Sequence, residues 1–239
     1  PAELRPIAKQ LHELFSRLQK SFERERQFSA DVSHELRTPI SAMLNIAEVG
    51  IKWKEEASKQ DYEAIRAIAE EMQHTVSQLM DLSRADSGEL ELFIEPVSIG
   101  EVVHSTWNRY EAKSVERNLN VSLADFEGIL WDLDRSLFER VVDNLIENAV
   151  CYSTEGGDIE ISMSSEQTSL IIRNQCSGLK ESDLDKLFHR FWRNDSARSS
   201  SMHSGLGLSV AAAFARGLGL RLEASLESGD IFEIRLTQH

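Results

Sequence analysis

A helical apolar stripe runs through the first fifty residues of the chain and restricts its fold more than any other feature. Apolar side chains recur at helix spacing in two runs: Ile7, Leu11, Leu14, Leu18 and Phe22, then Phe28, Val32, Leu36, Ile40 and Met43. A stripe over so many turns exceeds the usual length of a globular helix. Residues 2–53 are therefore predicted to form one long helix of a coiled coil or bundle. Pro39 cannot donate to the carbonyl of Glu35, so a kink is expected there.

A second predicted helix covers residues 60–85 and carries a heptad seam. Its apolar positions recur every seven residues in two series, Ile65, Met72 and Leu79, and Ile68, Thr75 and Leu82. A short segment joins the two helices into a hairpin. One hairpin cannot cover both of its apolar stripes, so two copies are expected to pair as a homodimeric four-helix bundle.

After Asp86-Ser87-Gly88 the pattern changes to short strands mixed with helices. Strands are expected at 90–97, 121–134, 159–163, 169–173, 221–224 and 231–236, and helices at 99–117, 136–152 and 206–215. Because the two kinds of element do not alternate strictly, this part is predicted to be an α+β sandwich. The predicted fold class is thus α+β, with an N-terminal helical hairpin followed by an α/β sandwich domain.

Charge and composition exclude several classes of function. The chain has 239 residues, 41% of them apolar, and a net charge of -14, which argues against nucleic-acid binding and against a basic membrane-surface patch. Its two cysteines, Cys151 and Cys176, have no metal-type spacing, so a reducing compartment is expected. No apolar run is long enough to span a bilayer. Since the chain begins at Pro1, we expect it to be part of a longer protein with its sensor or membrane anchor elsewhere.

The string Ser33-His34-Glu35-Leu36-Arg37-Thr38-Pro39 carries the first candidate chemistry. A neutral imidazole is a good nucleophile near pH 7. Glu35 can accept the other ring proton, and Thr38 lies one helical turn from His34, where it could position a water. A lone histidine on such a helix is more often a hydrogen-bonded bundle residue, but the whole string favours a functional histidine.

Downstream, polar residues interrupt otherwise apolar helices. Asn144 and Asn148 share one face of the helix predicted at 136–152, and amide oxygens suit Mg²⁺. Two exposed amides would be the simpler interpretation, but these interrupt an apolar face, where an unpaired amide is costly. Gly205 and Gly207 precede a helix, and their exposed amides suit a phosphate. Arg190 lies in an aromatic segment, and its forked guanidinium could stabilise negative charge spread over a transferring group.

The histidine string resembles the phosphoacceptor box of class I sensor histidine kinases. The resemblance implies that His34 takes the γ-phosphoryl group of ATP and passes it to an aspartate of a response regulator. It also implies that Glu35 acts as the base and that Thr38 supports removal of phosphate from the regulator. Residues 1–22 then resemble the end of a juxtamembrane signalling helix, 23–88 the dimerisation and phosphotransfer hairpin, and 89–239 a catalytic ATP-binding domain of the Bergerat type, as in histidine kinases and Hsp90.

Four later motifs resemble the nucleotide boxes of the same family and occur in the family's order. By this resemblance Asn144 lies near the phosphates, Asn148 holds Mg²⁺, and Arg190 contacts the γ-phosphate. The remaining implied nucleotide residues are Tyr152, Asn174, Gly178, Gly205, Leu206, Gly207 and Leu208. The Ser- and Arg-rich segment 195–202 is expected to be a lid over ATP. The family implies the cytoplasmic portion of a bacterial inner-membrane protein, with a receiver domain as partner.

The nucleotide boxes also depart from the family pattern. Asn174 stands where the family has Asp, which accepts from the adenine amine. Cys176 and His203 stand where it has Gly, and Cys151 where it often has a phosphate-contacting Lys. An alternative is therefore a pseudokinase-like or phosphatase-biased module with weak ATP binding. A structural coiled-coil adaptor is a third possibility, but it leaves Asn144, Asn148 and Arg190 unexplained.

Overall fold

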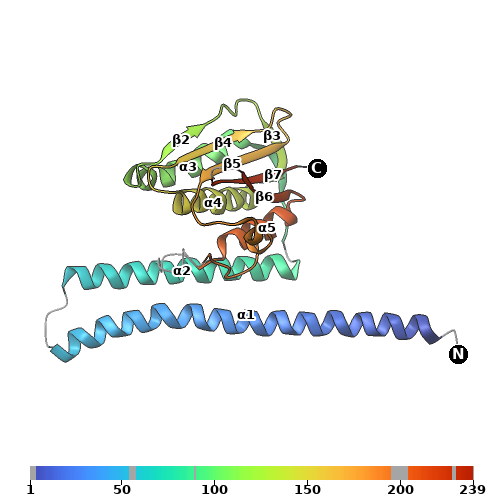
Figure 1. Ribbon diagram of the computed structural model, residues 1–239, viewed down its shortest axis with the longest axis horizontal. Coiled ribbons are helices and arrows are strands. Elements are labelled where there is room, and N and C mark those ends of the chain that lie inside the picture. Colours follow the sequence, from blue (N-terminus) through green and yellow to red (C-terminus); the bar gives the residue numbers. More distant parts are fainter. Residues whose placement is uncertain (1–3, 54–57, 89, 195–203, 228–229, 239) are drawn as a thin grey trace. The chain divides into compact units, whose positions relative to one another are not determined.

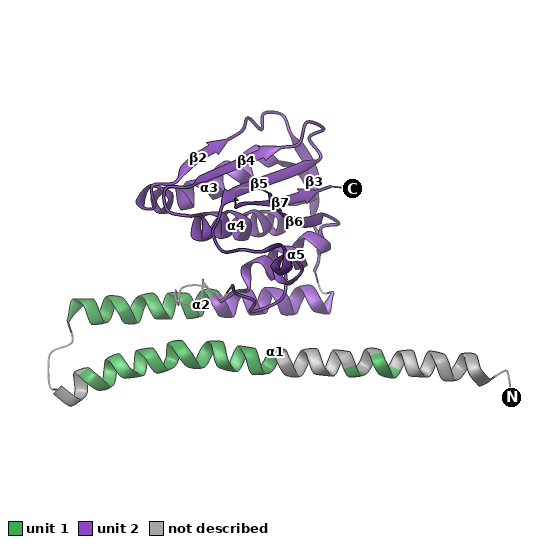
Figure 2. Cartoon of the chain, in the orientation of Figure 1, with its two compact units in different colours: residues 1–74 green, residues 75–239 purple. Residues whose placement is uncertain are grey.

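The computed structural model describes residues 4–53, 58–88, 90–194, 204–227 and 230–238, and for most of residues 4–27 and 50–53 the backbone alone (Figure 1). The chain divides into an N-terminal unit, residues 1–74, and a C-terminal unit, residues 75–239 (Figure 2). The second long helix crosses this division, so its last turns belong to the C-terminal unit.

Two long helices make up the N-terminal unit and the start of the next, as predicted. Helix α1 covers Leu4–Trp53 and continues on both sides of Pro39. Helix α2 covers Lys59–Ser87. Ser58 starts α2 because its amide donates to the Asp61 carboxylate at 2.8 Å while the Asp61 amide donates to the Ser58 hydroxyl at 3.2 Å. Hydrogen bonds to the Asp61 carboxylate from the Ser58 hydroxyl, at 2.7 Å, and from the Ser58 amide lower the pKa of Asp61.

The C-terminal unit is built on a five-stranded sheet with the order β2-β4-β5-β7-β6. Only the β2–β4 pair is parallel, and the other three pairs are antiparallel. The strands are β2 Asn120–Leu123, β4 Asp158–Met163, β5 Ser169–Gln175, β6 Arg221–Glu227 and β7 Ile231–Thr237. A separate antiparallel pair joins β1, Ile94–Ser98, to β3, Leu130–Asp134. The segment 121–134 therefore supplies strands to two different sheets.

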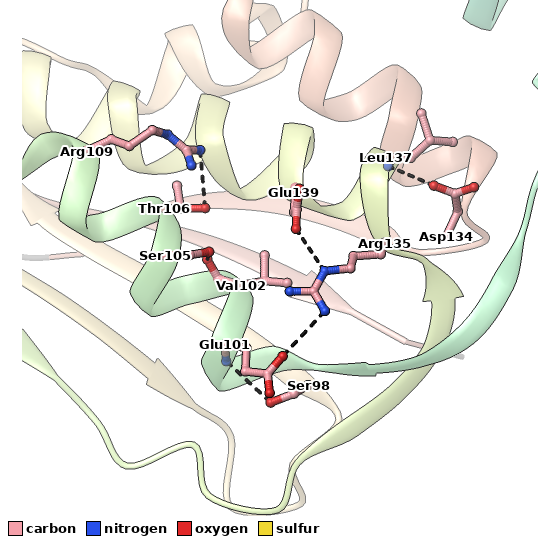
Figure 3. Close-up of polar contacts among 10 residues, drawn as sticks. All are labelled: Ser98, Glu101, Val102, Ser105, Thr106, Arg109, Asp134, Arg135, Leu137 and Glu139. Carbon is pink, nitrogen blue, oxygen red and sulfur yellow. Dashed lines mark hydrogen bonds and ion pairs between the residues drawn. The ribbon is translucent and has the colours of Figure 1, made fainter.

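Helices α3 (Ile99–Glu116) and α4 (Arg135–Tyr152) each begin directly after a strand of the small sheet. The Ser98 hydroxyl accepts from the Glu101 amide at 3.3 Å, and the Asp134 carboxylate accepts from the Leu137 amide at 2.9 Å (Figure 3). Such N-caps satisfy amides that lack a partner within the helix. Arg135 pairs with Glu139 one turn later at 3.0 Å (Figure 3). Paired strands thus fix where both helices begin.

One hydrophobic core lies between the sheet and the helices α3, α4 and α5 (Gly207–Gly217). Its largest fully buried side chains include Trp131, Phe138 and Phe214. Leu82, near the end of α2, is 2% exposed and belongs to the same core. The heptad seam predicted for α2 therefore ends inside the globular unit, where Leu82 contacts the sandwich core. A short 3₁₀ helix, Glu181–Lys186, precedes the aromatic segment 187–193, which forms turns.

Replacing Leu82 by Ala should destabilise the C-terminal unit although the residue lies on the long helix. Removal of a fully buried leucine costs about 2–5 kcal/mol. Val115 lies on α3 of the same unit and is 70% exposed, so Val115→Ala should cost below about 1 kcal/mol. Urea unfolding followed by tryptophan fluorescence measures both. Equal small losses would contradict the assignment of Leu82 to this core.

Candidate functional site

His34 lies on α1 with its side chain 79% exposed. The imidazole Nδ1 is 4.0 Å from the Glu35 carboxylate, too far for a hydrogen bond but close enough to become one after a small rotation. Thr38 donates its hydroxyl to the His34 carbonyl at 3.4 Å. The predicted acceptor string therefore presents an accessible imidazole with a carboxylate and a hydroxyl beside it on the N-terminal unit.

Asn144 is the meeting point of three helices of the C-terminal unit. Its amide nitrogen donates to the Arg140 carbonyl of the same helix at 2.8 Å. Its amide oxygen accepts from Gln78 of α2 at 3.3 Å. A Cβ on Gly207, the first residue of α5, would lie 3.1 Å from the same oxygen. The absence of a side chain at Gly207 thus lets α5 begin close against Asn144.

Glycine is required at position 205, before α5, and at position 207, the start of α5, for different structural reasons. Gly205 has φ +71°, which disfavours side chains, and a Cβ there would lie 2.8 Å from the Trp192 carbonyl oxygen. Gly207 instead makes room for Asn144, as described. Between and beside them, Leu206 and Leu208 are buried in the core. Buried leucines therefore hold the backbone of this segment in place, while its two glycines allow Trp192 and Asn144 to approach it closely.

Three polar residues on the last turns of α2 contact the predicted nucleotide residues or their neighbours. Arg190 forms an ion pair with Asp86. The Ser204 hydroxyl donates to the Gln78 side chain at 3.0 Å, and Gln78 also holds Asn144. The third contact is the ion pair between Asp81 and Arg140. The sequence analysis did not single out these α2 residues, because a heptad pattern ranks helix positions by apolar side chains alone.

Asn174 lies on β5, directly opposite Ile159 of β4 and Phe232 of β7. All three side chains are buried, and Asn174 is 3% exposed. Its amide nitrogen has no hydrogen-bond partner among the described residues. A buried amide without a partner costs about 1–3 kcal/mol, and a ligand that supplied a polar group here would offset that cost.

The loop after β5 keeps a glycine where its backbone needs one. Gly178 has φ +80°, and its carbonyl accepts from the Asn194 side chain at 2.6 Å. Cys176, where the resemblance expects the first glycine, is buried and lies outside the left-handed region. Its amide donates to the Asp230 carbonyl at 2.8 Å. A side chain at position 176 therefore imposes no backbone strain on this loop.

Asn148 and Tyr152 follow Asn144 at intervals of one helical turn on α4, and both are half-buried. Burial raises the pKa of Tyr152. Beside them, Lys113 of α3 donates to the Cys151 sulfur at 3.1 Å. Burial raises the pKa of the Cys151 thiol, although Lys113 opposes the shift. A cation from a neighbouring helix thus lies next to the position where the family often has lysine.

Two family models match the chain in the order that the motifs predict. Residues 24–88 match the His Kinase A phospho-acceptor domain, and residues 133–239 match the histidine kinase-, DNA gyrase B- and HSP90-like ATPases. The chain belongs to the class I sensor histidine kinases. His203 and segment 195–202 of this histidine kinase lie outside the described residues.

Similar proteins agree with this assignment. The Escherichia coli K12 sensor histidine kinase HprS is 32% identical over 244 residues, covering 100% of this chain and 53% of HprS. The structure of Acinetobacter baumannii histidine kinase AdeS is 26% identical, with a TM-score of 0.68 over 86% of this chain and 98% of that one. The structure of histidine kinase ThkA in complex with response regulator TrrA shares the fold, with 19% identity and a TM-score of 0.69 over 89% of this chain and 61% of that one.

The histidine kinase chain spans about half the length of the curated relatives it matches. Within its described residues, every helix is too short or too polar to cross a membrane.

The stability cost of a side chain at Gly205 has two parts, the close contact with Trp192 and the left-handed backbone, and these can be measured separately. Gly219 also has a positive φ, +73°, but a Cβ there would meet nothing within 4 Å. Gly219→Ala should cost about 1–2 kcal/mol of stability from the left-handed backbone alone. Gly205→Ala should cost about 1–3 kcal/mol more because its Cβ meets the Trp192 carbonyl. Urea denaturation gives both values, and equal losses would rule out the close approach.

Proposed function

We propose that this chain is the kinase core of a sensor protein, which phosphorylates His34 from Mg²⁺-ATP and passes the phosphoryl group to an aspartate of a response regulator. The exposed imidazole of His34 within the matched phospho-acceptor domain is the observation that carries the proposal. Residues 23–88 act as the dimerisation and phosphotransfer hairpin. Residues 89–239 act as the ATP-binding catalytic domain.

The acceptor string suits a histidine nucleophile. The lone pair of one ring nitrogen of His34 forms the bond to γ-phosphorus as the bond from phosphorus to the bridging oxygen breaks, and ADP leaves with that electron pair. The ring then carries a positive charge, which is relieved when a proton leaves the other nitrogen. Glu35, 4.0 Å from Nδ1, is placed to accept that proton.

Two features of the C-terminal unit fit a purine nucleotide. The start of α5 at Gly207 offers backbone amides and the positive end of the helix dipole, which favour a phosphate. The unsatisfied Asn174 amide is a buried group suited to a base. Arg190 would contact the terminal phosphate, Asn144 would lie near the phosphates, and Asn148 would hold Mg²⁺, whose bound charge offsets that of the phosphates. Tyr152, Gly178, Leu206 and Leu208 complete the proposed nucleotide contacts.

The proposed partners are a second copy of this chain and a receiver domain. Apolar side chains remain exposed along both long helices, as expected if a second hairpin covers them: Phe15, Ile40, Leu44, Val49, Tyr62, Val76 and Met80. The structure of ThkA in complex with response regulator TrrA, which shares this fold, supports the second partner. Because the matched relatives are longer, we further propose that the chain is the cytoplasmic portion of a bacterial inner-membrane sensor.

His34 should be the labelled residue when the chain is incubated with Mg²⁺ and ATP carrying a labelled γ-phosphate. The label should be lost in acid and kept in alkali, as expected of phosphohistidine, and should vanish in His34→Ala. His74 is also an exposed histidine, on α2. His74→Ala is therefore a matched control and should keep the label. Labelling that survives in His34→Ala would refute the proposed acceptor.

Thr38 should matter for removal of phosphate from the regulator more than for labelling of His34. Its hydroxyl, which now donates to the His34 carbonyl, can instead orient a water. Thr38→Ala should slow regulator dephosphorylation at least about tenfold, within the usual effect of a group that assists proton transfer. Thr38→Ser keeps the hydroxyl and should retain most of the rate. Parallel loss of labelling and dephosphorylation in Thr38→Ala would argue against a role limited to water.

A phosphatase-biased module with weak ATP binding is the second candidate. The four departures from the family's nucleotide boxes motivate it: Asn174, Cys176, His203 and Cys151. Such a module would speed regulator dephosphorylation through Glu35 and Thr38 while His34 stayed unlabelled. The labelling experiment, run together with the dephosphorylation assay, separates the two candidates.

A further inference from the structure

The buried amide of Asn174 offers a ligand both a donor and an acceptor. An asparagine side chain has a carbonyl oxygen and an NH₂ group. The NH₂ group lies buried with no partner among the described residues, on a strand whose neighbours Ile159 and Phe232 offer no polar side chain. A 180° rotation of the amide exchanges oxygen and nitrogen with little change in shape, so the ligand selects the orientation.

Purines differ at the edge that such an amide would contact. Adenine presents an amino donor at position 6 and an acceptor at N1. Hypoxanthine and guanine present the reverse, an oxygen acceptor at position 6 and an N1–H donor. An amide can pair with either edge through two hydrogen bonds after rotation. An ionised carboxylate has acceptors only, so it matches the adenine amine and repels the 6-oxo oxygen.

We propose that Asn174 determines base specificity in this chain, and that its nucleotide site accepts 6-oxopurine nucleotides as well as adenine nucleotides. The inference rests on the proposed nucleotide site, and it deepens that proposal by naming the substrate class. The buried, unpartnered amide carries it, because an amide can match either purine edge by rotation whereas a carboxylate matches only the amino edge.

Calorimetric titration of the whole chain with ADP, IDP and GDP in the presence of Mg²⁺ tests the inference without phosphoryl transfer. The three nucleotides share the ribose and diphosphate, so ratios of their dissociation constants report the base alone. IDP carries the 6-oxo edge without the 2-amino group of guanine. We expect ADP and IDP to bind within about tenfold of each other, since one good hydrogen-bonding match replaces another.

Asn174→Asp should convert the site to adenine selectivity. We expect tighter ADP binding and an ADP preference over IDP that rises at least about tenfold, because a charged acceptor strengthens one match and opposes the other. Gln175 is the next residue of β5 and is exposed. Gln175→Glu adds the same charge one position away and should leave the ratio unchanged. Circular dichroism checks that both variants fold.

The outcomes separate this inference from the proposed function. Binding of ADP with IDP rejected more than about a hundredfold by the native chain would overturn the role of Asn174 and leave the kinase proposal intact. That measurement needs no variant, so it decides the question even if Asn174→Asp fails to fold. If none of the three diphosphates binds at millimolar concentration, both the inference and the proposed nucleotide site fail.

Discussion

Helix α4 is held at both ends by side chains, and three candidate nucleotide residues, Asn144, Asn148 and Tyr152, take their position from it. Asp134 caps its first turn by accepting from the Leu137 amide. At the other end the Arg117 guanidinium, from the end of α3, donates to the carbonyls of Cys151 at 2.8 Å and Ser153 at 2.7 Å. A cation at a helix C-terminus satisfies free carbonyls and opposes the helix dipole. With both ends of α4 fixed, the Asn144 side chain stays against the start of α5.

The last turns of α2 are part of the helical hairpin and also pack into the C-terminal unit. They continue the hairpin helix, yet Leu82 is buried in the core of the C-terminal unit and Asp86 pairs with Arg190. Asp86 is 52% exposed, and an ion pair so open to solvent contributes little stability. A phosphate group carries more charge than one carboxylate, so Arg190 can exchange Asp86 for a nucleotide at small cost. The polar contacts of α2 therefore hold the arginine in place without blocking its proposed use.

Local pattern predicted much of this structure, and long-range pairing accounts for most of the differences. The two long helices and the start of α5 follow from apolar spacing and from glycine placement. The strand predicted at 90–97 forms only from Ile94, where pairing with β3 begins. The contacts of Gln78 with Asn144 and of Lys113 with Cys151 join residues far apart in the chain. No short-range period encodes such contacts, because they depend on how whole elements pack.

The departures from the family pattern gather in the nucleotide boxes, and the described residues accommodate two of them, at positions 176 and 151. Position 176 needs no glycine because its backbone is outside the left-handed region, whereas Gly178 keeps the positive φ. Position 151 lacks a lysine, but Lys113 brings a cation to its sulfur. At Asn174, by contrast, the buried amide nitrogen has no hydrogen-bond partner among the described residues. A site that had lost nucleotide binding would be under no constraint to keep the loop geometry at Gly178 or the cation beside Cys151. Their retention, together with one open hydrogen-bonding group, fits a site whose base preference has changed better than a site that has decayed.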